Sequence, residues 1–396
     1  MKIESAQPIQ WRFAQRAQQL QSSAIREILK VTMRPDIISF AGGLPSPATF
    51  PVERMQAAFD AVLSRQGSVA LQYGPTDGYA PLREWVAQSL SIDGTVISAD
   101  QVLMLSGSQQ GLDLLGKVLI DEQDKVLVET PSYLGALQAF SVYGPQFVSV
   151  PTDDAGLLPD AVAAIGQQAR LLYTLPNFQN PSGRSLSLER RTALVRICAQ
   201  LGLPLIEDDP YGALSYRGEP LPKMLTMNPD GVIYMGSFSK VLTPGIRLGY
   251  LVAPVPLVRK LEQAKQAADL HTSQLTQMVV HEVVKDGFLD THIPTIRQLY
   301  ADQCQVMLSA LAEHFPSSVT WTKPEGGMFI WVTLPEHIDS TQLLEQAIAH
   351  HVAFVPGAPF YANAPQKNTL RLSFVTVPPE RIREGIATLG RLIRLY

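Results

Sequence analysis

Seven short apolar runs, separated by helical patterns, constrain the fold of this chain more than any other feature of its sequence. Each run is almost continuously hydrophobic, which is typical of strands buried on both faces. Stretches with helical periodicity, such as 110–119 and 188–202, lie between them. The alternation predicts an α/β fold with a mainly parallel sheet covered by helices. The runs occupy residues 101–105, 124–129, 146–150, 170–176, 203–208, 231–236 and 246–253.

The pattern changes after about residue 285, and a chain of 396 residues is long enough for about two or three domains. An amphipathic stretch, 292–315, precedes three apolar segments that predict a smaller mixed sheet. Near the start, one helical segment, 23–32, is followed by a glycine- and proline-rich segment, 40–51, in which we expect no regular structure. The predicted units are an N-terminal arm at 1–45, a large domain at 46–285 and a small domain at 286–396.

Charge and cysteine content exclude several classes of protein. The 32 basic and 36 acidic side chains nearly cancel, and no local basic patch is present, so we expect neither nucleic-acid nor membrane binding. Cys198 and Cys304 lie far apart and outside metal-ligand spacing, which predicts two buried free thiols. The start is polar and no run of about 18 apolar residues occurs, so we expect a cytoplasmic protein.

The densest group of reactive side chains is the segment 236–249, which lies between two predicted strands. It contains Ser237, Ser239, Lys240 and Arg247. Hydroxyl groups and an arginine suit a phosphate, and the amine of Lys240 could reach a group attached to that phosphate. The same residues are also typical of a polar turn with an exposed lysine. The segment therefore predicts either an anion site with a reactive lysine or an ordinary loop.

A second anion signal lies where a predicted strand runs through Ser106 and Gly107 into a helix. Free N–H groups and the positive end of the helix dipole can bind phosphate, with Ser108 and Gln109 at the mouth. An ordinary serine N-cap explains the same residues. The GxGxxG spacing of dinucleotide sites is absent from the sequence, which argues against a nicotinamide or flavin cofactor.

Polar residues also follow two of the buried runs, where α/β proteins place ligand-binding groups. Asp208 ends one run and Tyr211 follows it, and a carboxylate there could hold a positive charge such as a protonated pyridine nitrogen. A helix cap and a metal ligand are the alternatives, but neither a histidine nor a third carboxylate is placed to complete a metal site. Asn177 and Asn180 follow another run, in a segment that also fits an Asx turn.

One arginine, Arg371, interrupts a short apolar strand in the second domain. An arginine with alternating apolar neighbours is often exposed on the outer face of a sheet. Its functional alternative is a bidentate clamp on a substrate carboxylate.

Together, the order and spacing of these motifs resemble the class I/II aminotransferases of the fold-type I pyridoxal-phosphate family over almost the whole chain. The 2-aminoadipate aminotransferase subgroup is the most similar. The resemblance implies a large domain with a mainly parallel seven-stranded sheet and a smaller α+β domain that includes the arm. It also implies pyridoxal 5'-phosphate as the cofactor and a homodimer with shared active sites. The segments that carry it include SAIREIL, LQYGPTDGYAPLR, GSQQGLDL, PSYLGALQAF, NFQNPSG, DDPY, SFSKVLTPGIRLG and NTLRLSF.

The resemblance assigns cofactor contacts to individual residues. Lys240 would hold the cofactor covalently, and Asp208 would pair with its ring nitrogen. Tyr211 and Asn180 would hydrogen-bond the ring hydroxyl oxygen, while Tyr133 would stack on the ring. The groups around the phosphate would be Ser108, Gln109, Ser237, Ser239 and Arg247.

The resemblance also implies how the amino acid and 2-oxo acid substrates bind. Arg371 would clamp the α-carboxylate, helped by Asn180 and the backbone near Gly43, and Tyr73 would reach into the neighbouring subunit's site. On the arm helix, Arg26 and Ser23 would contact a distal carboxylate. Arg26 could instead pair with a neighbour on a solvated helix face, or swing aside to admit apolar side chains. The donors would then be 2-aminoadipate, glutamate, leucine, phenylalanine or kynurenine.

Lys240 is the expected base, and we expect burial and Arg247 to lower its pKa. One departure from the subgroup is Asn177, where a smaller polar residue is expected. A lyase that performs β-elimination is an alternative, because the same cofactor supports it. A ligand-sensing domain of a transcription regulator is a second, although only a short arm precedes residue 40.

Overall fold

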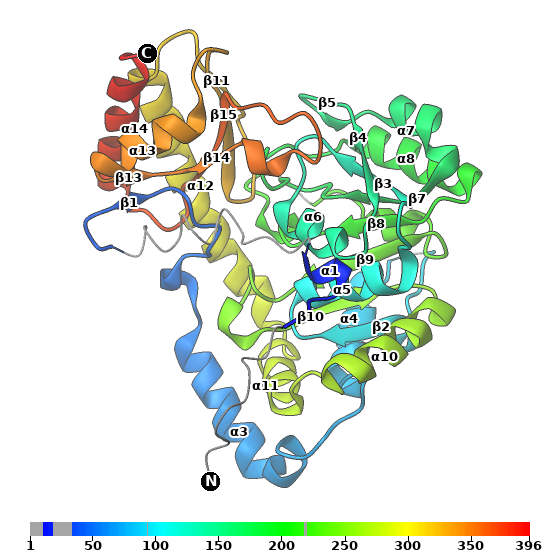
Figure 1. Ribbon diagram of the computed structural model, residues 1–396. Helices are drawn as coiled ribbons and strands as arrows, with labels where there is room; N and C mark the ends of the chain where they lie inside the picture. Colours follow the sequence, from blue (N-terminus) through cyan, green and yellow to red (C-terminus); the bar gives the residue numbers. More distant parts are fainter. Residues whose placement is uncertain (1–10, 19–33, 93, 218–219) are drawn as a thin grey trace, which may run out of the picture.

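A seven-stranded sheet lies at the centre of the larger part of the molecule (Figure 1). The computed structural model describes residues 11–18, 34–92, 94–217 and 220–396. The strand β10 pairs antiparallel with both of its neighbours, and all other pairs are parallel. Each strand coincides with one of the seven apolar runs, so the predicted α/β fold is confirmed. In sheet order the strands are β2 (Val102–Leu105), β10 (Gly249–Val252), β9 (Val232–Ser237), β8 (Leu205–Asp208), β7 (Ala169–Thr174), β3 (Lys125–Glu129) and β4 (Gln146–Val150).

Helices cover both faces of this sheet, which explains why its strands are hydrophobic at successive positions. Along β2, Leu103 and Leu105 pack into one apolar cluster, while Val102 and Met104 pack into another. The first cluster receives side chains from α5 (Ser108–Leu119), α6 (Leu134–Ser141) and α10 (Val255–Asp269). The second receives them from α4 (Ala80–Leu90), α7 (Pro159–Ile165), α8 (Leu188–Leu201), α9 (Met224–Met227) and α11 (Gln274–Val284).

The smaller part of the molecule contains a four-stranded sheet, which Figure 1 shows at the upper left. All of its pairs are antiparallel, so the prediction of a mixed sheet was wrong. The segment around residue 354 divides into two short strands, of which only β14 joins this sheet. In sheet order the strands are β11 (Thr320–Trp321), β12 (Phe329–Thr333), β15 (Thr369–Ser373) and β14 (Val355–Pro356).

The other short strand, β13 (Val352–Ala353), pairs in parallel with β1 (Ile38–Ser39) of the arm. The helices α13 (Ser340–Ala349) and α14 (Pro379–Ile393) pack beside them, and α12 (Phe288–His314) packs against α14. The pairing joins the arm to the segment around residue 352, while the domain boundaries near residues 45 and 285 stay a prediction. Within 40–51 the chain is not wholly irregular, because Pro47–Thr49 forms one 3₁₀ turn with proline at its first position.

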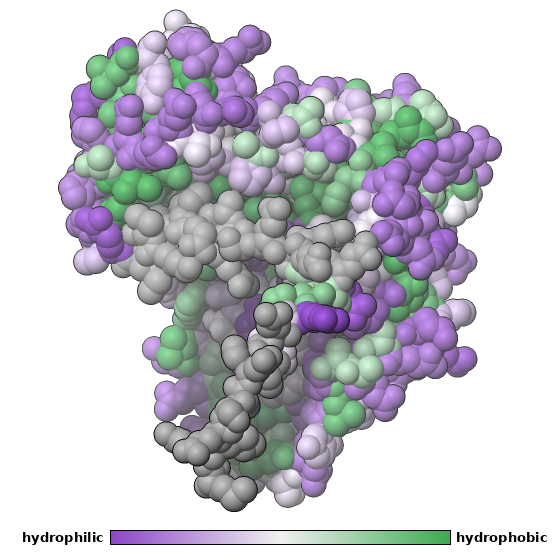
Figure 2. Space-filling model, in the orientation of Figure 1, coloured by the Kyte–Doolittle hydropathy of each residue, from purple (hydrophilic) through white to green (hydrophobic). Residues whose placement is uncertain are grey.

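The remaining elements include one long helix and a few short elements. The helix α3 (Val52–Ala70) extends beside α11 at the bottom of Figure 1. Hydrophilic residues cover most of the face shown in Figure 2, with smaller groups of hydrophobic residues between them. None of the helices that the structure describes is long and apolar enough to cross a membrane. Both cysteines are buried and free, as predicted. The short elements are α1 (Gln15–Gln18), β5 (Thr152–Asp153) and β6 (Gly156–Leu157).

Candidate active site

A cavity of about 370 Å³ opens where β8 and β9 end, between the large sheet and the arm. Its volume is in the range of small-molecule sites. The predicted site residues within the described ranges all line it, with the exception of Tyr73. The sequence did not point to three further residues on its wall, Leu44, Leu175 and Pro210. Each of them lies close in sequence to a predicted polar segment.

Lys240 lies in the turn after β9, and its Nζ donates a hydrogen bond to the carbonyl oxygen of Gly43 at 2.9 Å. This contact joins the turn to the arm across the cavity. Burial, and after it the nearby charges of Arg371 and Arg247, lower the pKa of Lys240 to about 8. Burial and Arg247 were the predicted causes of this lower pKa, whereas the larger effect of Arg371 was not predicted.

Asp208 is the last residue of β8, and its side chain is almost fully buried. The hydroxyl of Tyr173 on the neighbouring strand donates to its Oδ2 at 2.7 Å. The pKa of Asp208 is raised to about 7, because burial and the charge of Asp209 raise it by more than the Tyr173 hydrogen bond lowers it. A positively charged group in the cavity would favour the ionised carboxylate. Sequence analysis missed Tyr173, whose only signal is a hydroxyl within an apolar run.

Arg371 on β15 is 2% exposed, so the alternative of an arginine on the outer face does not hold. It donates from Nη1 to Oδ1 of Asn180 and from Nη2 to the carbonyl oxygen of Ala41, both at 2.7 Å. Its guanidinium lies 4.3 Å from the ring centre of Phe329. Nε has no hydrogen-bond partner among the described residues. Burial lowers the pKa of Arg371 to about 10, so it is still a cation at neutral pH.

Two tyrosines line the same cavity as Arg371. The side chain of Tyr211 hydrogen-bonds with that of Asn180, and its ring packs edge-on against Phe329. Burial raises the pKa of Tyr133 to about 12 and also raises that of Tyr211. Both phenols therefore keep their protons at neutral pH and can donate hydrogen bonds to an anionic oxygen.

The predicted phosphate-binding groups surround the start of α5, whose first residue is Ser108. Gly107, which precedes it, has φ of 88°, a conformation that favours glycine. A Cβ atom at Gly107 would lie 2.5 Å from Nη2 of Arg247, so the glycine leaves room for that guanidinium beside the helix start. The backbone N–H of Ser239 donates to Oγ of Ser237 at 3.1 Å. The result is a cationic cradle with free N–H groups, which suits a phosphate.

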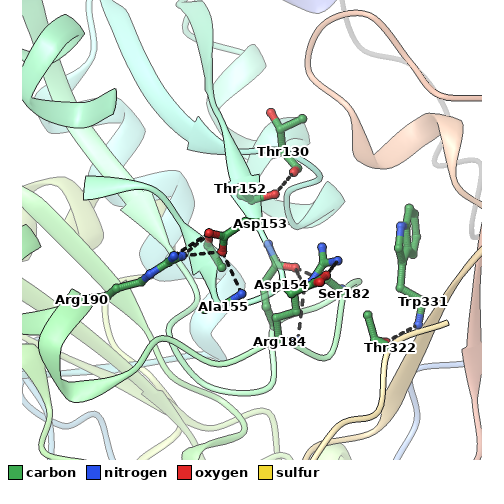
Figure 3. A network of polar contacts seen from close by, with 12 residues as sticks. Thr130, Thr152, Asp153, Asp154, Ala155, Ser182, Arg184, Arg190, Thr322 and Trp331 are labelled. Atoms are coloured by element: carbon green, nitrogen blue, oxygen red, sulfur yellow. Dashed lines mark hydrogen bonds and ion pairs between the residues drawn. The ribbon is translucent and has the colours of Figure 1, made fainter. Parts of the chain in front are cut away.

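The loop that carries Asn180 is held to the large sheet by Gln179. The Nε2 atom of Gln179 donates hydrogen bonds to Glu129 and to the carbonyl oxygen of Pro131. On its outer side, Arg184 forms an ion pair with Asp154 at 2.8 Å (Figure 3). These contacts hold the loop between the large sheet and the strand pair β5–β6.

Asn177 does not line the cavity. Its Nδ2 donates to Asp209 at 2.7 Å, and its Oδ1 accepts from the fully buried Arg191. Asp209 in turn accepts from the backbone N–H of Gly212, close to Tyr211. The departure noted in the sequence therefore concerns the support of the site and not its wall.

Three predicted residues are not placed in the cavity. Tyr73 is 78% exposed, with its ring edge-on to His271 at 5.6 Å, and its predicted role at a neighbouring subunit stays a prediction. Ser23 and Arg26 lie outside the described residues. Across the described ranges, no three His, Cys, Asp or Glu side chains gather as metal ligands.

The described residues fit pyridoxal phosphate on physical grounds. A cationic cradle at a helix start suits its phosphate, and a buried carboxylate that favours a nearby cation suits its ring nitrogen. Lys240, with its pKa lowered to about 8, suits its aldehyde. One cofactor molecule can contact all of these groups only if they line the same cavity, and they do.

Comparison with known proteins identifies the family. A family model described as aminotransferase class I and II matches residues 36–389. The chain is 45% identical to a 2-aminoadipate transaminase of Thermus thermophilus, over 98% of each chain. It is also 45% identical to aromatic-amino-acid aminotransferase 1 of Thermococcus litoralis, over 96% of this chain and 94% of that relative.

A solved structure agrees with these sequence comparisons. It is an α-aminoadipate aminotransferase from Thermus thermophilus, complexed with N-(5'-phosphopyridoxyl)-L-leucine. Its TM-score is 0.91 at 44% identity, and the match covers 96% of this chain and 97% of that chain. The resemblance inferred from sequence is thus confirmed, and pyridoxal phosphate is the cofactor. The chain belongs to the class I and II aminotransferases, of fold type I.

Proposed function

We propose that the protein moves an amino group between an L-amino acid with a long side chain and a 2-oxo acid, 2-oxoglutarate being the expected acceptor. The donors we propose are 2-aminoadipate, glutamate and amino acids of the leucine or aromatic type. The observation that carries the proposal is the buried guanidinium of Arg371, which lines the cavity with Lys240 and is a cation at neutral pH. An α-carboxylate is the substrate group that such a guanidinium binds.

We assign the steps to the chain's own groups as follows. When bound, pyridoxal phosphate supplies an aldehyde that accepts the amino group and a ring that withdraws electrons from the substrate α-carbon. Arg371 and Asn180 bind the α-carboxylate and orient the α-carbon toward Lys240. The neutral amine of Lys240 would then take the α-proton on Nζ and hold it as an ammonium group until the proton is passed on. Asp208 would pair as a carboxylate with the ring nitrogen, and Tyr211 would hydrogen-bond the ring oxygen.

The lowered pKa of Lys240 makes a prediction for pH. An amine attacks an aldehyde only when neutral, and the neutral fraction of Lys240 grows as pH rises through about 8. The rate at which cofactor-free protein attaches pyridoxal phosphate should therefore rise with pH and level off above about 8. Absorbance measured in a stopped-flow instrument follows this rate, with Nα-acetyl-lysine as the reference amine. A rate that rises in parallel with the reference up to its unperturbed pKa of about 10.4 would contradict the assignment.

Donor specificity is proposed to be dual. Two of the relatives are named for 2-aminoadipate and aromatic amino acids, and the solved structure holds a leucine adduct of the cofactor. In this chain Leu44 lies at the cavity and is 56% exposed, which offers an apolar surface to a side chain. Arg26 and Ser23 on the arm are the proposed contacts for a distal carboxylate.

The test of both proposals is a panel of donors with 2-oxoglutarate as acceptor. Arg26→Ala should lower kcat/KM for 2-aminoadipate and glutamate about tenfold or more, because a charge-assisted hydrogen bond contributes roughly 1.5–3 kcal/mol. Turnover of leucine and phenylalanine should change little. Arg259→Ala, which removes an exposed arginine of α10, is the matched control. An unchanged ratio of acidic to apolar turnover would show that Arg26 does not select the donor.

The same panel separates transamination from β-elimination. A lyase would release pyruvate and ammonia from a β-substituted amino acid without any 2-oxo acid. An aminotransferase needs the acceptor to complete its cycle. Dependence of donor consumption on 2-oxoglutarate therefore supports the proposed function.

We further propose a homodimer with shared active sites. Large apolar side chains are exposed on α3 and on the segment that follows it, and exposed apolar patches of this kind mark protein interfaces. Tyr73, the residue proposed to reach the neighbouring site, is in the same segment. A cytoplasmic location stays a prediction from the sequence. The exposed apolar residues are Val52, Leu63, Val69, Leu71 and Tyr73.

A further inference from the structure

We propose that Tyr173 is a positioning residue that keeps Asp208 ionised and holds its carboxylate in place for the cofactor's ring nitrogen. The inference rests on the role proposed for Asp208. It adds a second residue to that role, one that does not line the cavity.

The geometry of the pair carries the proposal. Tyr173 and Asp208 lie on adjacent parallel strands, β7 and β8, and the phenol donates to Oδ2 at 2.7 Å. Tyr173 is fully buried, and its ring packs edge-on against Phe140 with centres 5.8 Å apart. The ring is thus fixed on one side by Phe140 and at its hydroxyl by the carboxylate.

No other side chain or backbone N–H in the described part of the chain donates to Asp208. A buried carboxylate usually accepts two or more hydrogen bonds, since each unpaired oxygen lacks the solvation it had in water. Here only Oδ2 has a donor, while the side chain lines the cavity. Oδ1 is therefore available to a group within the cavity, and a protonated ring nitrogen is the partner that its charge favours.

The charges around Asp208 explain why a donor is needed. Two carboxyl groups interact electrostatically with Asp208, namely Asp209, which follows β8, and Glu129 at the end of β3. The phenols of Tyr133 and Tyr211 face it from the cavity side. Carboxylates and burial disfavour a second negative charge, so the protein opposes ionisation of Asp208 on several sides. The cations on the cavity wall are Lys240, Arg247 and Arg371.

Tyr173 can supply that donor at any working pH. Burial and the nearby negative charge of Asp208 raise the pKa of Tyr173 well above 10, so its hydroxyl keeps its proton. Its hydrogen bond opposes the effect of burial on the pKa of Asp208, which is about 7 in the protein without cofactor. Removing the hydroxyl would raise that pKa further, and a neutral Asp208 could not balance a positively charged ring.

The test compares two ligands that cannot attach to Lys240. One is pyridoxamine 5'-phosphate, and the other is its 1-deaza analogue, which has carbon in place of the ring nitrogen. Tyr173→Phe should weaken binding of the first about tenfold, the effect of losing a hydrogen bond to a charged group. Affinity for pyridoxamine 5'-phosphate should fall as Asp208 becomes protonated at low pH. In Tyr173→Phe this fall should begin at a higher pH than in the wild type. Binding of the deaza analogue should change little.

Tyr143→Phe is the matched control. It removes another phenol that donates to a carboxylate, Asp113, at 2.8 Å but lies outside the cavity. Equal loss of affinity for both ligands in Tyr173→Phe would point to a general structural defect and overturn the proposal. So would an unchanged preference for the pyridine over the deaza ligand. If the wild type itself binds both ligands equally well, the role proposed for Asp208 is wrong, and the role of Tyr173 that depends on it is wrong too.

Discussion

Replacing Lys240 with alanine is expected to lower transamination by about 10⁴-fold, the upper range for loss of a positioned acid–base group. The variant should also lose the absorption band of the covalently attached cofactor. Both effects follow from one amine, which lies in the cavity with its pKa lowered to about 8. Steady-state rates with 2-oxoglutarate and a spectrum of the purified protein measure them.

Two further variants make this result specific. Lys240→Arg keeps a cation in the cavity but cannot act as a base at neutral pH, so its turnover should fall as far as that of the alanine variant. Lys260→Ala removes an exposed lysine of α10 and should leave turnover unchanged. Normal transamination by Lys240→Ala would refute the assignment of the catalytic lysine.

Replacing Arg371 with alanine is expected to lower kcat/KM for every amino-acid donor by about 10²–10³-fold, because removal of one partner from a buried charge pair costs roughly 2–5 kcal/mol. The reason is that the guanidinium is buried, carries its charge at neutral pH and lines the cavity. Arg371→Lys should recover only part of the loss, since an ammonium cannot form two parallel hydrogen bonds. Steady-state kinetics across the donor panel measure the effect.

An amine substrate without a carboxylate separates recognition from misfolding. Its slow turnover should be nearly the same in the wild type and in Arg371→Ala, because no carboxylate is present for the arginine to bind. Arg381→Ala, on the surface of α14, is the control substitution. A similar loss with both kinds of substrate would mean that Arg371 supports the structure and does not select the carboxylate.

The central sheet was predictable because its strands are buried on both faces. Successive residues of β2 enter two different clusters, so each position had to be apolar and the run was visible in the sequence. The smaller sheet was less predictable. Its strand β14 contains only Val355–Pro356, and the neighbouring β13 pairs with the arm instead. Strands this short carry too few residues for periodicity to reveal their partners.

The cavity wall was predictable where a motif carried the chemistry, as at Lys240 and Asp208. Contacts that depend on the order of strands were not. Tyr173 is 35 residues from Asp208 in sequence, and only the pairing of β7 with β8 brings them together. The bond between Lys240 and Gly43 likewise depends on where the arm lies. Neither contact has a local sequence signal.

The contacts of Arg371 have a consequence for how the protein orients its substrates. Its guanidinium belongs to the smaller sheet but is held by Asn180 of the large unit and by Ala41 of the arm. The position of this guanidinium relative to Lys240 is therefore set by the packing of the smaller sheet against the loop of Asn180 and against the arm. Every α-amino acid carries its α-carboxylate and its α-hydrogen on the same carbon, so this packing orients all donors alike and leaves the choice between them to contacts with their side chains.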